Sequence, residues 1–115
     1  MATVEAPVHA TESAEKIRRA ILSIFPGARL KNDGKTLAGE CDLTNFFALA
    51  KREQLRSVLL SVAVGNAREG KTFIDLNKVA ALAGLLSVDE GSVLGAIRIN
   101  AQLADFEAGL NTGGQ

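Results

Sequence analysis

The sequence predicts an α+β protein of two layers, in which helices cover one face of a mainly antiparallel sheet. Strand-like and helix-like segments follow one another in the order β-α-β-β-α-β-β, with the strands clustered in pairs. Residues 28–31 and 35–41 are the two expected strands of a hairpin, and Asp33-Gly34 lies between them. Asp-Gly is a hairpin signal because glycine tolerates the positive φ of a tight turn. Paired strands beside amphipathic helices favour antiparallel pairing with the helices on one face.

A strand and a helix are predicted at the start of the chain. Residues 3–10 alternate loosely in polarity, and Pro7 has no N–H to donate, so we expect this strand at a sheet edge or with a bulge. Thr11 is the candidate N-cap of the following helix, which Pro26-Gly27 ends. The apolar face of this helix repeats at helical spacing and contains Ile17, Ala20, Ile21 and Ile24.

Two further helices, or one long bent helix, are predicted after the hairpin. Asp42 or Thr44 can cap the first of them, because short polar side chains accept from the free backbone N–H groups there. The apolar stripe shifts its phase near residues 51–54, and the helical pattern ends near Gly65-Asn66.

The last third of the chain predicts strands and short helices. Residues 72–76 favour a strand, and residues 79–86 fit either a strand or a short helix. Residues 93–101 alternate again, with Ile97 and Ile99 on one face and Arg98 on the other. A final short helix is predicted from the spacing of Leu103, Phe106 and Leu110.

Length and composition bound the classes of protein that fit. The 115 residues are 47% hydrophobic and 23% charged, which is typical of a globular domain with one core. We expect a single α+β domain over residues 1–110 and a disordered tail at residues 111–115. Thirteen basic residues balance thirteen acidic ones, and this zero net charge excludes a strongly basic nucleic-acid binder of the histone type.

The sequence also disfavours a metal-binding protein, a disulfide-bonded protein and a membrane protein. Cys41 is the only cysteine, which excludes an internal disulfide and a cysteine-cluster zinc site. His9 is the only histidine, and it has no Asp, Glu or Cys partner at ligand spacing. No apolar run approaches the roughly 20 residues of a membrane span. We therefore expect a cytoplasmic protein with no metal, no cofactor, no membrane partner and no catalytic residue.

Charge is segregated along the chain despite the overall balance. Residues 16–72 hold eleven basic and five acidic side chains, a net charge of +6, whereas both flanking segments are acidic. Such a segment can present a phosphate-binding surface even in a neutral protein. The candidate phosphate contacts are Lys16, Arg19, Arg29, Lys31, Lys35, Lys51 and Arg52, with Lys78 as a weaker candidate. The alternative is that these side chains only form the solvated faces of amphipathic elements.

The manner of RNA recognition also follows from composition. The chain has no Tyr and no Trp, and its five Phe mostly fit core positions, so a base-stacking platform is not expected. We expect contacts to the phosphates and to the shape of a structured RNA. This interpretation requires the candidate cations to lie on a common side of the molecule.

A phosphate-loop pattern, G-x-x-x-x-G-K-[ST], occurs at residues 65–72. A working loop of this kind follows a strand and precedes a helix. Here the preceding residues keep helical spacing, and residues 73–75 favour a strand. We therefore expect a helix end at Gly65, a polar loop and a solvated Lys71 rather than a nucleotide site.

Five segments, in one order, resemble a family of small uncharacterised archaeal proteins. They are VHATE at residues 8–12, IFPG at 24–27, REQL at 52–55, LNKVAALAG at 76–84 and SVLGAI at 92–97. The chain departs from the family pattern where Ala10, Val93 and Ala96 replace Pro, and where Val79 replaces Gln. The resemblance implies a two-layer α+β fold related to the 5S rRNA-binding protein of the large ribosomal subunit, and a homodimer. It also implies RNA binding, because relatives are described as predicted RNA-binding proteins.

Three functional hypotheses remain open. The leading one is a non-enzymatic RNA-binding protein, of which a ribosome-associated protein is one form. The alternative is a structural homodimer or protein-interaction module, whose apolar face would be probed by a charge at Ile97 or Ile99. The third is a small nucleotide binder that uses Lys71 and Thr72 of the phosphate-loop pattern.

Overall fold

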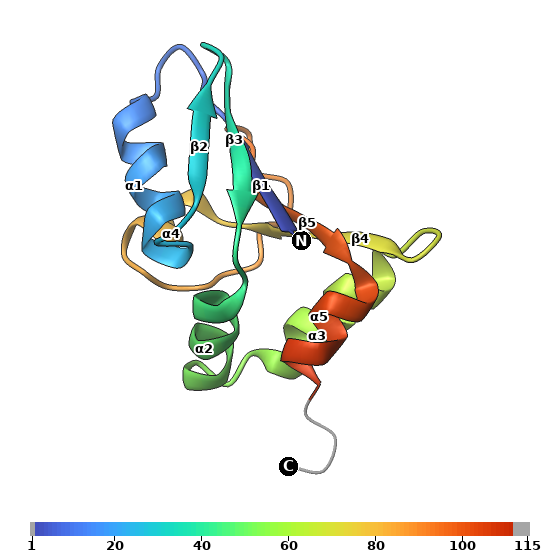
Figure 1. The fold of residues 1–115 in the computed structure, drawn as a ribbon. Coiled ribbons are helices and arrows are strands. Elements are labelled where there is room, and N and C mark those ends of the chain that lie inside the picture. Colours follow the sequence, from blue (N-terminus) through green and yellow to red (C-terminus); the bar gives the residue numbers. More distant parts are fainter. Residues whose placement is uncertain (1, 112–115) are drawn as a thin grey trace.

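A five-stranded antiparallel sheet and five helices form the fold in the computed structural model, which describes residues 2–111 (Figure 1). The strands are β1 (Ala2–Pro7), β2 (Arg29–Asn32), β3 (Thr36–Cys41), β4 (Lys71–Leu76) and β5 (Ile97–Gln102). The helices are α1 (Ala14–Ile24), α2 (Thr44–Arg52), α3 (Arg56–Gly65), α4 (Lys78–Leu82) and α5 (Leu103–Leu110). The predicted α+β class is confirmed.

The sheet has one buried face and one solvent-accessible face. Its strand order is β2-β3-β1-β5-β4, with every neighbouring pair antiparallel. Val4 of β1 lies opposite Gly39 of β3 and Ile99 of β5, and this row faces the helices. Because side chains alternate along a strand, the residues between them form the other side, which we call the open face. None of the open-face residues is buried.

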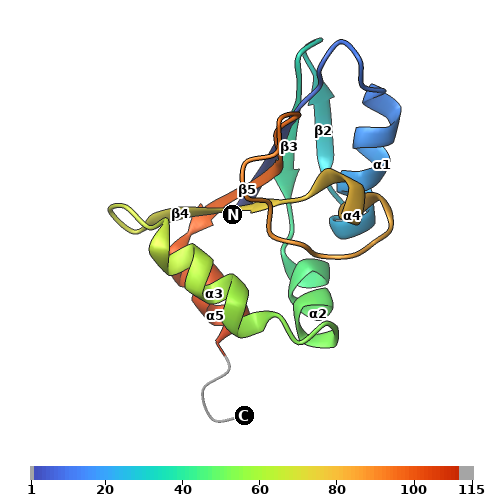
Figure 2. The same ribbon diagram turned by 180° about the vertical axis from the view of Figure 1, so that it is seen from behind.

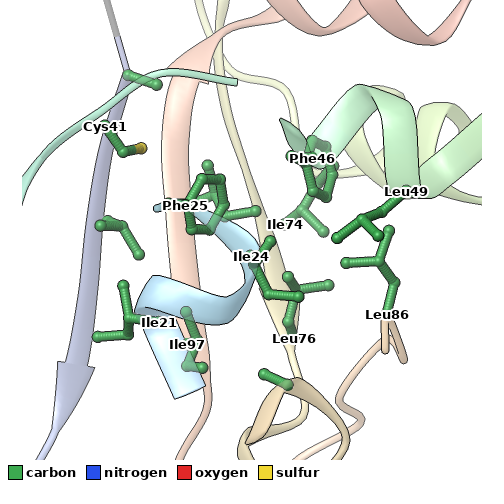
Figure 3. Close-up of a cluster of buried hydrophobic side chains, with 14 of the residues drawn as sticks. Ile21, Ile24, Phe25, Cys41, Phe46, Leu49, Ile74, Leu76, Leu86 and Ile97 are labelled. Atoms are coloured by element: carbon green, nitrogen blue, oxygen red, sulfur yellow. The ribbon is translucent and has the colours of Figure 1, made fainter. Parts of the chain in front are cut away.

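The core lies between the sheet and the helices. Figure 3 shows side chains of α1, α2, β4 and β5 pointing toward one another in this layer. Three fully buried rings, those of Phe25, Phe46 and Phe106, lie at its centre. The Phe46 ring stands 6.0 Å from Phe25 and 6.3 Å from Phe106 between centroids, distances at which aromatic pairs attract.

The position of β1 corrects one prediction. We expected its proline to place it at a sheet edge or to cause a bulge, but β1 is the central strand and pairs with β3 without interruption. Pro7 is its last residue, and pairing with β5 covers only Thr3–Glu5 of β1. The missing N–H of Pro7 therefore lies beyond the β1–β5 hydrogen bonds, where a central strand tolerates it.

The helix ends agree with the sequence, but the two predicted N-caps do not. Ser13, and not Thr11, caps α1, because its Oγ accepts from the backbone N–H of Lys16. The N-cap of α2 is Leu43, which has no side-chain cap bond, and Asp42 before it accepts from the N–H of Thr44 at 2.7 Å in a turn. The shift in the apolar stripe near residues 51–54 marks the break between α2 and α3, where Gln54 has φ of 58°.

Two ambiguous segments are settled by the structure. Within residues 79–86, the segment up to Leu82 belongs to the short helix α4, whose N-cap is Asn77. The last strand begins at Ile97 rather than at Val93. The prediction of one domain over residues 1–110 stays a prediction, and the predicted tail lies, apart from Asn111, outside the described residues. Among residues 2–111, no helix combines the length and the apolar character needed to cross a bilayer.

Candidate nucleic-acid interface

The β2–β3 hairpin is built by its own polar side chains. Asn32 accepts from the N–H of Gly34, and Asp33 accepts from the N–H groups of Lys35 and Thr36 at 2.9 and 2.8 Å. These two backbone donors hold the pKa of the Asp33 carboxyl below its usual value. Gly34 has φ of 95°, the left-handed conformation that the predicted turn requires. The hairpin thus presents Lys35 at a fixed turn.

Arg29 and Lys31 lie on the open face at the edge of the sheet. They belong to β2, the outermost strand, and are two residues apart, so their side chains share a face. Across the β2–β3 pair, Arg29 lies opposite Glu40 and Lys31 lies opposite Ala38. Both basic side chains are exposed.

Helix α1 adds two further exposed cations, of which Lys16 lines a hollow between α1 and α4. In both views α1 runs alongside β2 (Figures 1 and 2). The loop before α1 contacts the hairpin turn, where the N–H of Val8 donates to the carbonyl of Lys35 at 2.7 Å. Lys16 and Arg19 lie one helical turn apart and are exposed. We call Lys16, Arg19, Arg29, Lys31 and Lys35 the basic edge.

The candidate cations are not all on one side, which corrects our expectation. Arg29 and Lys31 point from the open face, whereas α1 packs on the opposite face of the sheet. Lys51 and Arg52 end α2, away from the hairpin turn (Figure 1). The basic edge therefore spans both layers at one border of the sheet, and the α2 pair forms a separate group.

None of the five basic-edge side chains makes a hydrogen bond or ion pair within residues 2–111, and neither do those of Lys51 and Arg52. Glu40 stands across from Arg29 in the sheet without forming a bridge to it. These cations remain available to a ligand, and the same exposure fits a solvated surface. Whether they contact RNA stays a prediction.

Lys78 has a structural role instead. Its ammonium donates to the carbonyls of Pro7 and Leu94, both at 2.7 Å, and to Glu12 at 3.0 Å. Its side chain is only 10% exposed. Because all three donors of the ammonium are taken, we leave Lys78 out of the proposed contacts.

The phosphate-loop pattern has the wrong surroundings, as the sequence predicted. Gly65 ends helix α3, and Lys71 begins strand β4, so the order of elements is the reverse of a nucleotide-binding loop. The hydroxyl of Thr72, which would bind magnesium, is buried and donates to the carbonyl of Ala63. Lys71 is exposed at the strand start.

A cavity of about 470 Å³ lies between β1, β3, α2 and α5. Three carboxylates, those of Glu40, Asp42 and Asp105, line it together with Arg29. Three carboxylates around one guanidinium disfavour a phosphate inside the cavity, so Arg29 can contact a phosphate only outside it. Cys41 also lines it, and burial together with the charge of Asp42 raises the pKa of its thiol to about 11. In the range 2–111, no cluster of His, Cys, Asp and Glu has the geometry of a metal site.

One feature of the open face was missed by the sequence reasoning. Phe73 is not a core residue but lies on the open face of β4, and the guanidinium of Arg98 covers its ring at 4.0 Å from the centroid. Asp75 holds the same guanidinium by two hydrogen bonds of 2.8 and 3.0 Å. The strict alternation of Thr72, Ile74 and Leu76 as buried residues was the signal that could have placed Phe73 outside.

Comparison with known proteins adds the family context. A family model described as RNA binding matches residues 1–103. The UPF0201 protein of Methanothermobacter thermautotrophicus is 31% identical over 108 residues, which cover 90% of this chain and 82% of that protein. A UPF0200/UPF0201 protein of Archaeoglobus fulgidus is 26% identical over 103 residues, covering 87% of this chain, but the match spans only 32% of that longer protein.

Solved structures share the fold. The UPF0201 protein from Methanococcus jannaschii superposes with a TM-score of 0.84 at 24% identity, covering 98% of this chain and 95% of that one. A second UPF0201 protein, described as uncharacterized, gives a TM-score of 0.80 at 21% identity, covering 88% and 80%. A Sulfolobus solfataricus protein gives 0.70 at 15% identity, covering 96% and 97%. The expected resemblance to an archaeal family is thereby confirmed.

Proposed function

Because this chain belongs to the protein family described as RNA binding, we propose that it binds RNA, without catalysing a reaction, through the basic edge. The observation that carries the proposal is the group of five exposed cations on α1 and the β2–β3 hairpin, none of which is neutralised by an ion pair among residues 2–111. Unpaired Lys and Arg side chains at one border of a fold are the usual contacts to a phosphate backbone.

The arrangement favours backbone contacts over reading of a base sequence. Lys16 and Arg19 project from a helix, and Arg29 and Lys31 from an edge strand, so the cations form a border and share no common cleft; Lys16 and Arg29 line two separate hollows. Lys35 extends this border at the hairpin turn. A phosphate backbone can follow such a border, whereas base edges need donors and acceptors set in a groove.

Salt dependence of binding tests this mechanism. If about five phosphates are neutralised, the logarithm of the association constant should fall with the logarithm of the salt concentration at a slope of about −3.5 for single-stranded RNA, and more steeply for a duplex. Fluorescence anisotropy with a labelled RNA over a range of KCl concentrations measures the slope. A slope near zero contradicts the proposal.

A matched pair of double variants assigns the contacts to the basic edge. Lys31→Ala with Lys35→Ala removes two hairpin cations, and Lys51→Ala with Arg52→Ala removes two equally exposed cations at the end of α2. We expect the hairpin double variant to weaken RNA binding and to flatten the salt slope by about 1.4. The second pair should leave both nearly unchanged, and an equal effect of the two pairs would contradict the assignment to one border.

Three finer statements extend the proposal. We propose that the RNA is structured, in keeping with the likeness of the sequence to the family related to the 5S rRNA-binding ribosomal protein. We also propose a ribosome-associated role and a cytoplasmic location. Co-sedimentation of the chain with ribosomal subunits in a cell extract, against a chain carrying the hairpin substitutions, tests these statements, and a chain found only in the free fraction contradicts the ribosomal role.

A homodimer or protein-interaction module is the second candidate, and one observation favours it. Val79 and Leu82 of α4 are 79% and 41% exposed, and Leu85, just after this helix, is 50% exposed. Adjacent exposed apolar side chains of this kind mark interaction surfaces. Ile97 and Ile99 are fully buried, so a charge there would unfold the chain instead of probing a dimer.

The surface of α4 therefore supplies the better test. In sedimentation equilibrium, the wild-type chain should be a dimer and the Val79→Glu variant should be a monomer. A wild-type chain that stays monomeric at the highest concentration measured contradicts this candidate and leaves the RNA proposal untouched.

A further inference from the structure

We propose that the open face of the sheet holds an unpaired nucleobase, which stacks on the outer side of the Arg98 guanidinium and enters the cavity beside it. This inference rests on the proposed RNA binding and extends it from the phosphate backbone to a base. It departs from the expectation from composition that no base-stacking platform is present.

The stacking surface is already formed in the free protein. The guanidinium of Arg98 lies 4.0 Å from the centroid of the Phe73 ring, so one of its two flat sides is covered. Two hydrogen bonds to Asp75 keep the group from rotating. The Arg98 side chain is nevertheless 44% exposed. A fixed, planar group with one free side is the kind of surface on which proteins stack unpaired RNA bases.

A cavity of suitable size opens beside this group. Its volume is about 340 Å³, within the lower range of small-molecule sites. The cavity is lined by Glu5, Pro7, Thr36, Asp75, Ala96 and Arg98. Pro7 and Ala96 supply apolar surface, and Thr36 and the charged groups supply polar atoms, a combination that suits a flat heteroaromatic ring.

The charges of the cavity select the base and reject the phosphate. Glu5 and Asp75 flank Arg98 on the neighbouring strands, so the lining carries two negative charges and one positive charge. A phosphate would be repelled there. One oxygen of Glu5, Oε1, accepts from Asn100, which leaves Oε2 to accept from a ligand. A base with an exocyclic amino group can donate to that oxygen, whereas the corresponding position of uracil carries an acceptor.

The cavity and the basic edge can contact the same strand of RNA. Lys31, Ala38, Glu5 and Arg98 follow one another in register across four neighbouring strands. Three strand spacings of about 4.8 Å place the backbones of Lys31 and Arg98 roughly 14 Å apart. Single-strand sites of the size seen in other folds, about 4–16 nucleotides, span this separation. The phosphates would follow β2 while one base turns inward.

Arg98→Lys is the sharpest test, because it keeps the positive charge beside Asp75 and removes the planar surface. We would measure binding of oligocytidine and oligouridine RNAs of about 12 nucleotides by anisotropy over a range of KCl concentrations. Wild type should prefer oligocytidine, and Arg98→Lys should weaken that binding roughly ten-fold without changing the salt slope. Gln102→Ala, on the same strand and face but outside the cavity, is the matched control and should change nothing.

A second variant keeps the proposal testable if the first loses stability. Glu5→Gln at an exposed position removes the carboxylate acceptor, and it should abolish the preference for oligocytidine. Salt-dependent RNA binding that neither variant alters would overturn the base site and leave the basic edge standing. Absence of any RNA binding by the wild-type chain would overturn both proposals.

Discussion

Removal of the Lys78 ammonium should destabilise the fold more than removal of the charge from any exposed lysine. This group joins α4 to two other parts of the chain: the stretch from the end of β1 to the start of α1, through Pro7 and Glu12, and the loop before β5, through Leu94. The side chains of Lys78 and Glu12 are only 10% and 13% exposed. In Lys78→Met the apolar stem of the side chain is largely retained and the charge is lost.

The expected cost follows from the groups left behind. Two carbonyls lose a donor, and the Glu12 carboxylate keeps only the backbone N–H of His9 at 3.1 Å. Breaking a buried ion pair by removing one partner costs about 3–5 kcal/mol of unfolding free energy. Because a tenth of each side chain still meets water, we expect about 3 kcal/mol, which is a fall in Tm of roughly 12 °C for a chain of this size.

Urea and thermal unfolding of the wild type and four variants measure this effect. Lys78→Met, Glu12→Gln and the double variant complete a thermodynamic cycle, and Lys16→Met removes an exposed lysine of α1 as the matched control. The control should change the unfolding free energy by less than about 0.5 kcal/mol. A loss below about 1 kcal/mol in Lys78→Met, or strictly additive effects in the double variant, would refute the reasoning.

The remaining predictions concern other single positions. Burial raises the pKa of the Glu12 carboxyl, but hydrogen bonds from His9 and Lys78 outweigh it and the net pKa is lowered. The folded state therefore gains stability from Glu12 above pH 4.5 and loses it as the pH falls through the lower folded pKa, so urea midpoints of wild type and Glu12→Gln should converge in acid. Gly39→Ala should lose about 2 kcal/mol or more in urea unfolding, because the new Cβ would lie 1.7 Å from the carbonyl of Arg29, whereas Gly27→Ala meets no atom within 4 Å and should have little effect. Cys41 should resist iodoacetamide in the native state at pH 8 and react after unfolding, since its pKa is raised to about 11; rapid native alkylation, followed by mass spectrometry, would contradict this.

Features set by neighbouring residues were predictable from the sequence. The hairpin at Asp33-Gly34 depends on side chains that bond to the next two or three N–H groups, and the structure confirms it. Asp42 likewise accepts from the N–H of Thr44 two residues on, although the N-cap of α2 is Leu43. Alternation also gave the correct faces of β5, with Ile97 and Ile99 buried on one side.

Features that depend on distant pairing were not predictable in the same way. Alternation reports which face a residue takes, but it does not report which strands flank it, so the central position of β1 was missed. The Glu12–Lys78 pair joins residues 66 positions apart, and the sequence showed only a lysine in an apolar stretch. Phe73 was not singled out among the five Phe, although its place in the alternation put it on the open face.

The candidate interface was predictable in part. The sequence picked out the cations, and all seven outside Lys78 are exposed and unpaired among residues 2–111. Their grouping was not predictable, because it depends on α1 lying beside β2 (Figure 2). Arg98 was recognised only as an outward residue, since its partners Phe73 and Asp75 come from another strand.

The salt dependence of RNA affinity tests the central claim most directly. It is best measured on the wild-type chain and on the Lys31→Ala, Lys35→Ala double variant with the same labelled RNA. We predict a steep slope for the wild type, about −3.5 on a single strand, and a slope near −2.1 for the variant. Affinity that does not change with salt, or equal slopes for the two proteins, would contradict the assignment of RNA binding to the basic edge.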